Sequence, residues 1–318
     1  MKVSRKNAGI HASNFKKGVI RENVELFMLV LPGFLLTFIF CYLPMFGIII
    51  AFKNFNPNLG IFESQWVGIE NFKFFFQSND FLRIMRNTLL YSSSFLMLDN
   101  AVAVFLAILL YNIQKRAALK FYQTTMILPN FMSMVLVAYV VYAILNPTAG
   151  ALNQILSIIM RDDVNTQWYA KANYWPFILT IVHIWKSAGM KTIIYYAALM
   201  GIDESLFEAA RIDGATNRQE IRYIIIPELT SIICIYLILG VGGLVSGDFG
   251  LFYQVPMNIG VLYPTTDIIN TYIFRALQDG THMGRTAAVG LFQSVTGTIL
   301  VVASNVVIKK VSPEHSLF

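Results

Sequence analysis

The chain has 318 residues, of which 56% are apolar and 13% are charged. A soluble domain carries roughly 25% charged residues, and soluble cores in a chain of this length do not bury so much apolar surface. The composition therefore excludes a disordered chain, a secreted disulfide scaffold and most soluble enzymes, and it indicates an integral membrane protein. The net charge of +6 fits basic cytoplasmic loops better than nucleic-acid binding.

Six apolar runs are long enough to cross a bilayer as helices. About 20 residues at a rise of 1.5 Å span a hydrocarbon core of roughly 30 Å. We expect the first run to be an uncleaved span, because a signal-peptide core has only about 7–15 residues and no small-x-small cleavage site follows here. The predicted spans are Leu26–Phe52, Thr88–Leu110, Met126–Leu145, Trp175–Leu199, Ile224–Gly247 and Ala287–Ile308.

The distribution of lysine and arginine predicts the orientation. These residues are more numerous in the two terminal segments, in residues 111–122 and in residues 200–223 than in the alternating loops. By the positive-inside rule both termini are then cytoplasmic. The loops predicted to face the exterior are 51–87, 146–174 and 248–286.

The chain is expected to form one domain. We predict a basic cytoplasmic segment over residues 1–25, a six-helix transmembrane domain over residues 26–308 and a cytoplasmic tail over residues 309–318. The two cysteines, Cys41 and Cys234, lie in apolar runs, with no CxxC pair and no metal-ligand spacing. We therefore expect them to be small buried side chains, and we expect no metal site.

Residues 203–227, between the fourth and fifth spans, are predicted to form two short helices with a sharp corner. Asp203 is placed to cap the first helix, and Gly214 can take the left-handed conformation that ends it. Thr216 starts the second helix and forms a capping box with Gln219.

One face of the first short helix is suited to contact a partner. Leu206, Phe207, Ala210 and Arg211 recur at a spacing of three to four residues. The small side chains of Ala209 and Ala210 allow close approach. The alternative is an amphipathic helix that lies on the lipid surface.

This segment resembles the EAA loop of binding-protein-dependent ABC importer permeases. That pattern is Glu-Ala-Ala, three residues, Gly, nine residues and Ile-x-Leu-Pro. This chain departs from the pattern only at Ile226, where leucine is usual. The segment Asp213–Ala215 is typical of the carbohydrate branch. The matching residues are Glu208, Ala209, Ala210, Gly214, Ile224 and Pro227.

Segments along most of the chain resemble the maltose-type permease superfamily, and within it the LplB-like polysaccharide and oligosaccharide subgroup. They cover the first outer loop, the third span with its following loop, the last span and the end of the first span. The segments are Trp66–Phe72, Arg86–Thr88, Leu128–Ser133, Gly150–Asn153, Ala288–Ser294 and Tyr42–Gly47.

The resemblance implies an all-α, type I importer permease fold in a bacterial cell membrane. It implies a heterodimer with a second homologous permease, two cytoplasmic ABC ATPase subunits and an extracellular solute-binding lipoprotein that delivers a carbohydrate. The chain has no G-x-x-x-x-G-K-[ST] phosphate loop. It is therefore expected not to be an enzyme and to hold no cofactor, with ATP and magnesium on the partner subunits.

The resemblance also implies the mechanism and the residues that couple it. ATP-driven closure of the ATPases would rock the spans between inward- and outward-facing states. The predicted ATPase-coupling residues are Asp203, Leu206, Phe207, Glu208, Ala209, Ala210, Arg211, Asp213, Gly214 and Pro227.

The substrate pathway is predicted from polar and aromatic groups in the spans and in the last outer loop. Intramembrane polar groups usually face a cavity, and an aromatic ring can stack on a sugar. The other reading for Lys186 is that it caps another helix or pairs with Asp99. The candidates are His183, Trp185, Lys186, Tyr253 and Gln293.

Four polar or small-residue features of the spans have packing explanations as well. Lys191 can bind backbone carbonyls. Asp99 and Asn100 are expected to pack against another span. Gly243 and Gly247 are expected to pack helices closely, with a bend near the substrate as the alternative. Ser294, Thr296 and Thr298 are expected to combine hydrogen bonds between helices with pathway lining.

Three other functions compete with sugar import. The first is an ABC importer for a peptide, phosphate ester or polyamine, and the sugar-type segments argue against it. The second is a secondary transporter driven by an ion gradient, which would need no ATPase. The third is an intramembrane enzyme, against which the sequence offers no H-E-x-x-H, no G-x-S-x-G and no paired membrane aspartates.

Overall fold

A computed structural model describes residues 24, 26–280 and 282–311. The predicted basic N-terminal segment therefore lies, apart from Val24, outside the described residues. The same holds for residues 312–318 of the predicted tail. Among the described residues the fold is helical, with one short antiparallel pair of strands, β1 (Lys53–Asn54) and β2 (Gln65–Trp66).

Among the described residues, five helices are long and apolar enough to cross a membrane, and they correspond to five of the six predicted spans. The first keeps its helical course over Leu26–Phe52 through a π-turn and a 3-10 segment. The fifth predicted span consists of α11 (Ile226–Gly242) preceded by α10 (Asn217–Glu220) and the π-turn η5 (Ile221–Ile225). The long helices of the second, fourth and sixth predicted spans are α4 (Phe81–Tyr111), α8 (Trp175–Leu199) and α15 (Met283–Val311).

The third predicted span, Met126–Leu145, is made of two helices rather than one. It consists of α5 (Arg116–Phe131) and α6 (Met134–Leu145), which are bent by 101°. Pro129 lies in the last turn of α5, where a proline removes a backbone donor. Ser133 then starts α6 by accepting a hydrogen bond from the Leu136 amide at 3.2 Å.

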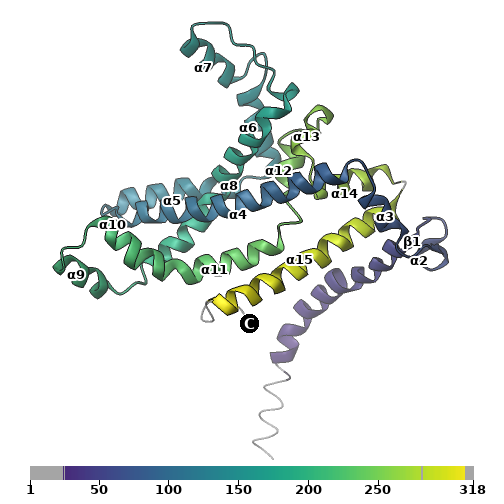
Figure 1. Ribbon diagram of the computed structural model, residues 1–318, viewed down its shortest axis with the longest axis horizontal. Helices are drawn as coiled ribbons and strands as arrows, with labels where there is room; N and C mark the ends of the chain where they lie inside the picture. Colours follow the sequence, from purple (N-terminus) through teal and green to yellow (C-terminus); the bar gives the residue numbers. More distant parts are fainter. Residues whose placement is uncertain (1–23, 25, 281, 312–318) are drawn as a thin grey trace, which may run out of the picture.

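The spans pack in pairs, and shorter helices lie at both ends of the bundle, while α6 projects from its side (Figure 1). Helix α8 packs along α4 and α5, and α11 packs along α15. Helix α9 (Glu204–Ile212) lies beyond one end, whereas α3 (Glu70–Phe76) and α14 (Ile269–Asp279) lie at the other. The remaining short helices are α2 (Gly60–Glu63), α7 (Ala151–Met160), η3 (Trp168–Ala170), η4 (Ala172–Tyr174), α12 (Phe249–Gln254), η6 (Gly260–Leu262) and α13 (Tyr263–Thr266).

Three apolar clusters hold these elements together. The largest joins α6, α8 and α12 around the buried Trp175. The second joins α4, α8, α9 and α11 at the α9 end, around Tyr195 and Phe207. The third joins α3, α4, α14 and α15 at the opposite end, around Phe75. Each end of the bundle therefore has its own core.

Close contact between spans depends on glycines other than the predicted pair. A Cβ on Gly242 of α11 would lie 2.4 Å from Val301 of α15, and one on Gly297 of α15 would lie 2.8 Å from the Gly242 carbonyl oxygen. Gly243 instead caps the C-terminus of α11, and Gly247 has a φ of +71°. The pair Gly243 and Gly247 thus lies where the helix ends, so the predicted close packing of spans by this pair is wrong, and the alternative, a bend near the substrate, stays a prediction.

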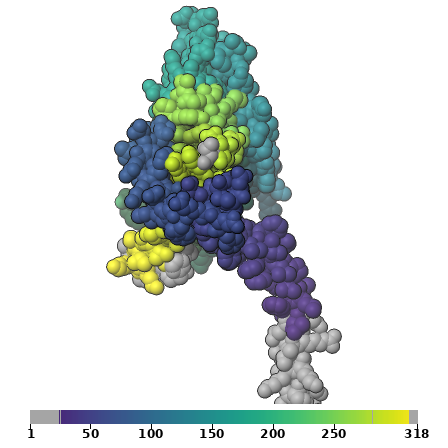
Figure 2. Space-filling view, turned by 90° about the vertical axis from the view of Figure 1, so that its right-hand side faces the viewer, coloured from purple at the N-terminus to yellow at the C-terminus, as the bar shows by residue number. Residues whose placement is uncertain are grey.

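The N-terminal part of the first span projects away from the rest of the chain (Figure 2). None of its most apolar window is buried within the chain, and its main packing partner is the outer part of α15, which its last turns contact. Cys41 on this span is exposed and Cys234 is half-buried, so the expectation that both are buried is wrong. The apolar surface of this span is available to lipid or to another subunit.

Candidate coupling segment and transport path

Helix α9 begins at the residue that the sequence predicted. Asp203 has extended backbone angles, and its Oδ1 accepts a hydrogen bond from the Ser205 amide at 3.0 Å. This hydrogen bond holds the pKa of Asp203 below its usual range, because it stabilises the ionised carboxylate. The carboxylate of Asp203 therefore caps the start of the helix.

The corner after α9 is also formed as predicted. Gly214 has a φ of +80°, which an L-residue with a side chain rarely adopts. The Ala215 amide donates to the Ala210 carbonyl at 2.9 Å and closes the helix end. Thr216 and Gln219 form the capping box of α10, with the Thr216 amide donating to Gln219 Oε1 at 2.7 Å.

Phe207 anchors α9 to the bundle. Its side chain is 1% exposed and lies in the cluster formed by α4, α8 and α11. Its ring centroid is 5.9 Å from that of Tyr111 at the end of α4. The predicted contact face therefore divides, because Phe207 faces the chain's own core while Leu206 remains 45% exposed.

An ion pair joins the two short helices. Arg211 Nε of α9 donates to Glu220 Oε1 of α10 at 3.1 Å. Glu220 is buried, so this contact fixes the angle between α9 and the entry to the fifth span. A hollow of about 280 Å³ lies beside it, and Asp213, Gly214 and Tyr223 are among the residues that line it.

The free surface of α9 points away from the spans. Glu208 and Ala209 are exposed, and Ile212 is 86% exposed. The sequence reasoning missed Ile212, although an isoleucine next to the predicted face is a detectable signal. Pro227, another predicted coupling residue, lies at the start of α11. It therefore belongs to the fifth span and not to the exposed surface of α9.

A buried polar cluster connects α4 to α8 inside the membrane-spanning region. Asp99 Oδ2 accepts hydrogen bonds from Lys191 Nζ at 2.7 Å and from His183 Nε2 at 3.1 Å, and Asp99 Oδ1 accepts one from Ser187 Oγ at 2.7 Å. Next to it, Tyr195 donates to Asn100 Oδ1 at 2.6 Å. The expectation that Asp99 and Asn100 pack against another span agrees with this geometry.

The two lysines of α8 have different partners. The sequence allowed Lys186 to cap a helix or to pair with Asp99, and it allowed Lys191 to bind backbone carbonyls. Lys186 Nζ donates to the carbonyls of Pro129, Asn130 and Met132 at 3.3, 3.2 and 2.7 Å. It therefore caps the end of α5, which was one of the alternatives. Lys191 pairs with Asp99 and does not bind backbone carbonyls in these contacts. His183 and Lys186 are thus both engaged within the chain.

Trp185 lies on an apolar groove between helices. The groove has a volume of about 290 Å³, is lined by α4, α5 and α8, and includes Pro129 and Gly189. Tyr253 packs among aromatic rings, with centroids 5.1 Å from Phe249 and 4.8 Å from Phe274. Neither ring lies on the hydroxyl-lined groove of α11 and α15 described next.

That groove contains the remaining pathway candidate, Gln293. It has a volume of about 440 Å³ and is lined by residues of α11, α15 and the turn after α11. Gln293 Nε2 donates to Asn270 Oδ1 of α14 at 2.9 Å. The sequence reasoning did not name Ser246, which the turn after α11 brings to this face, or Asn270, which α14 brings to Gln293. The lining residues are Gly242, Ser246, Gln293, Ser294, Gly297, Thr298 and Val301.

Among the described residues no group of three or more histidine, cysteine, aspartate or glutamate side chains is placed to hold a metal ion. The arrangement is that of a bundle with a helical handle at one end, an ion pair inside and a polar groove along two spans.

Comparison with known proteins defines the class. The chain belongs to the family of binding-protein-dependent transport system inner membrane components, whose model matches residues 99–313. Family membership and the apolar helices make it a multi-pass protein of the bacterial plasma membrane with the type I importer permease fold.

Two curated relatives cover almost the whole chain. Protein LplB of Bacillus subtilis is 33% identical over 93% of this chain and 92% of the relative. The polygalacturonan/rhamnogalacturonan transport system permease protein YteP of Bacillus subtilis is 32% identical over 91% of this chain and 89% of the relative.

A solved structure has the same fold. It is a bacterial ABC transporter involved in the import of the acidic polysaccharide alginate. A chain of it is 30% identical and has a TM-score of 0.84, with 94% of this chain and 99% of that chain covered. A second structure holds that transporter in complex with an alginate pentasaccharide-bound periplasmic protein.

Proposed function

We propose that this chain is a permease subunit of an ATP-driven importer that moves an oligosaccharide or polysaccharide fragment from an extracellular solute-binding lipoprotein into the cytoplasm. It pairs with a second homologous permease, and each permease engages one of two cytoplasmic ABC ATPase subunits. ATP and magnesium are bound by those subunits. Both termini lie on the cytoplasmic side, as the lysine and arginine distribution favours.

One observation carries the proposal. Helix α9 projects beyond the spans with Glu208 and Ala209 exposed, and it is fixed to them through Phe207, whose side chain is 1% exposed. A helix that only lay on lipid would not need a buried anchor shared with α4, α8 and α11. The arrangement suits a rigid handle that a partner displaces.

Displacement of α9 has a direct route into the spans. Phe207 packs against α4, α8 and α11, and the Asp99 cluster ties α4 to α8 within the bilayer. Helix α11 is in close contact with α15 through Gly242 and Gly297. A push on α9 therefore moves these spans as rigid bodies, which is the motion that alternating access requires.

The carbohydrate assignment draws on the groove and on the relatives. The groove of α11 and α15 presents Ser246, Gln293, Ser294 and Thr298, and such hydroxyl and amide groups hydrogen-bond sugar hydroxyls. Curated relatives include a polygalacturonan/rhamnogalacturonan permease, and the structural neighbour imports alginate. Another relative is a sn-glycerol-3-phosphate permease, 28% identical over 291 residues, so a phosphate ester is the alternative cargo.

Reconstitution of the full complex tests the proposal. Glu208→Lys reverses a charge on the exposed face of α9, and we expect it to abolish glycan-stimulated ATP hydrolysis while the complex remains in the membrane. Glu63→Lys makes the same change on the exposed part of α2 at the other end of the molecule, and it should leave stimulation intact. Normal stimulation in Glu208→Lys would contradict the coupling role of α9.

A further inference from the structure

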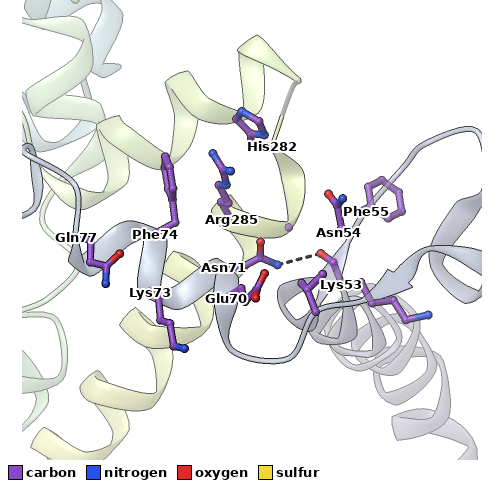
Figure 3. Close-up of a pocket in the computed structure, with 12 residues that line it drawn as sticks. Lys53, Asn54, Phe55, Glu70, Asn71, Lys73, Phe74, Gln77, His282 and Arg285 are labelled. Carbon is purple, nitrogen blue, oxygen red and sulfur yellow. Dashed lines mark hydrogen bonds between the residues drawn. The ribbon is translucent and has the colours of Figure 1, made fainter.

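A cavity of about 580 Å³ opens at the end of the bundle opposite α9. Two neighbouring segments, the strand region 53–55 and helix α3, line it together with the start of α15, which is distant in the sequence (Figure 3). The pathway candidates lie elsewhere, and none of the functions assigned above uses this cavity.

The frame of the cavity is preformed. Asn71 of α3 is buried, and its Nδ2 donates to the carbonyls of Ala51 and Lys53, both at 2.9 Å. Gly284 of α15 sits against the same strand, where a Cβ would lie 2.4 Å from the Lys53 carbonyl oxygen. Lys53 Nζ donates to the carbonyls of Ile61 and Phe62 at 2.7 and 2.9 Å, so its charge is already engaged outside the cavity.

Arg285 provides an unengaged positive charge in this frame. Its guanidinium lies 3.6 Å from the centroid of the Phe74 ring, a stacking that fixes the planar group in place. It forms no hydrogen bond or ion pair with another residue in the described part of the chain. Two nearby arginines differ, because Arg83 and Arg275 both pair with the buried Asp267.

The other groups around Arg285 are suited to a polyhydroxylated ligand. The amides of Asn54 and Gln77 line the cavity, as do the His282 ring and the Glu70 carboxylate. No hydrogen bond joins these four side chains to other described residues. Phe55 adds an aromatic ring. The donors and acceptors of a sugar ring would pair with the amides and with Glu70.

We propose that this cavity is a subsite for a sugar unit that carries a carboxylate, with Arg285 as the residue that binds the carboxylate. A guanidinium matches a carboxylate with two parallel hydrogen bonds. The volume lies within the roughly 300–1,000 Å³ of small-molecule sites. The carboxylate of a protein side chain would pair with Arg285 but would leave the surrounding amides unused. This inference rests on the proposed function and specifies where an acidic glycan meets this subunit.

Equilibrium binding to the whole complex tests the inference. The probes are a galacturonate trisaccharide and its methyl ester, which lacks the charges and is larger by one methyl group on each carboxyl group. The complex is held in phosphatidylcholine nanodiscs without ATP and without binding protein. We expect the acid to bind at least about tenfold more tightly than the ester, because charge-assisted hydrogen bonds are lost with the ester.

Two matched variants locate the effect. Arg285→Gln should remove the preference for the acid, whereas Arg161→Gln, on an exposed residue after α7, should retain it. Basal ATP hydrolysis and co-purification of the subunits report assembly of each variant. If Arg285→Gln does not assemble, Arg285→Lys keeps the charge without the planar fork and should retain only part of the preference.

Each contrary result has a definite meaning. Equal binding of acid and ester, or an unchanged preference in Arg285→Gln, overturns the inference. So does a loss of binding-protein docking in Arg285→Gln without a change in sugar binding, which would assign Arg285 to a protein carboxylate. Retention of phosphatidylglycerol by the wild type alone would assign it to a lipid phosphate and likewise overturn the inference. A neutral glycan that stimulates ATP hydrolysis while the acid fails to bind would leave the proposed function standing.

Discussion

At the scale of single residues, Asp99 shows how an apolar span tolerates a charge. Its side chain is 6% exposed and accepts three hydrogen bonds, all from side chains of α8. An unpaired carboxylate at this depth costs free energy, and the ion pair with Lys191 offsets that cost. The same ion pair joins α4 to α8 in one register. The same lysine would be equally costly if Asp99 were removed.

The pair makes a directional prediction about stability. Asp99→Asn should lower the free energy of unfolding by about 3–5 kcal/mol, because Lys191 then keeps a poorly solvated charge without its carboxylate. The double variant Asp99→Asn/Lys191→Gln should recover part of the loss, since neither charge remains. Thermal unfolding of the purified complex in detergent measures both.

A surface pair serves as the control for this comparison. Asp80 pairs with Arg83 at 3.0 Å and is 48% exposed, so Asp80→Asn should change the free energy of unfolding by less than about 1 kcal/mol. If Asp99→Asn melted at the same temperature as the wild type, the ion pair would have no role in joining α4 to α8.

At the scale of secondary-structure elements, α9 combines an inner anchor with an outer surface. We expect Phe207→Ala to remove about 3–5 kcal/mol of packing from the contact between α9 and the bundle. Glycan-stimulated ATP hydrolysis should fall, and amide hydrogen exchange in α9 should rise. Phe207→Leu should retain most of both properties, and Leu206→Ala should leave exchange unchanged because its side chain is half-exposed. Full stimulation in Phe207→Ala would show that α9 does not need this anchor.

The elements also show what the sequence could predict. The fourth span, α8, runs over the predicted Trp175–Leu199, because the length of a mainly apolar run is a local property of the sequence, even where it includes Lys186 and Lys191. The corner at Gly214 and the capping box at Thr216 were predictable for the same reason. The assignment of the coupling segment required the spacing of Glu208, Ala209 and Ala210, and not their polarity alone.

Other features depend on residues that are distant in the sequence. The bend between α5 and α6 is held by Lys186 from another helix, and no periodicity in residues 126–145 reveals it. The burial of Phe207 needs the ends of three spans to meet. The free charge of Arg285 is visible only after Asp267 is seen to engage other arginines.

At the scale of the whole molecule, helix spacing is set by a few glycines. A Cβ on Gly189 of α8 would lie 1.8 Å from the Met126 carbonyl oxygen of α5, so Gly189→Ala must separate these helices. We expect a marked loss of folded complex, measured by the yield of monodisperse protein and by its melting temperature. Gly290→Ala on α15 meets nothing within 4 Å and should be neutral or stabilising, by up to about 1 kcal/mol. Equal yields for the two variants would contradict close packing of α5 on α8.

The detachment of the first span has a consequence for biogenesis. Its side chains are apolar on all sides and need no protein neighbour within the bilayer. This helix can therefore insert into the bilayer on its own, and its exposed face stays available to a second subunit after the other spans have packed.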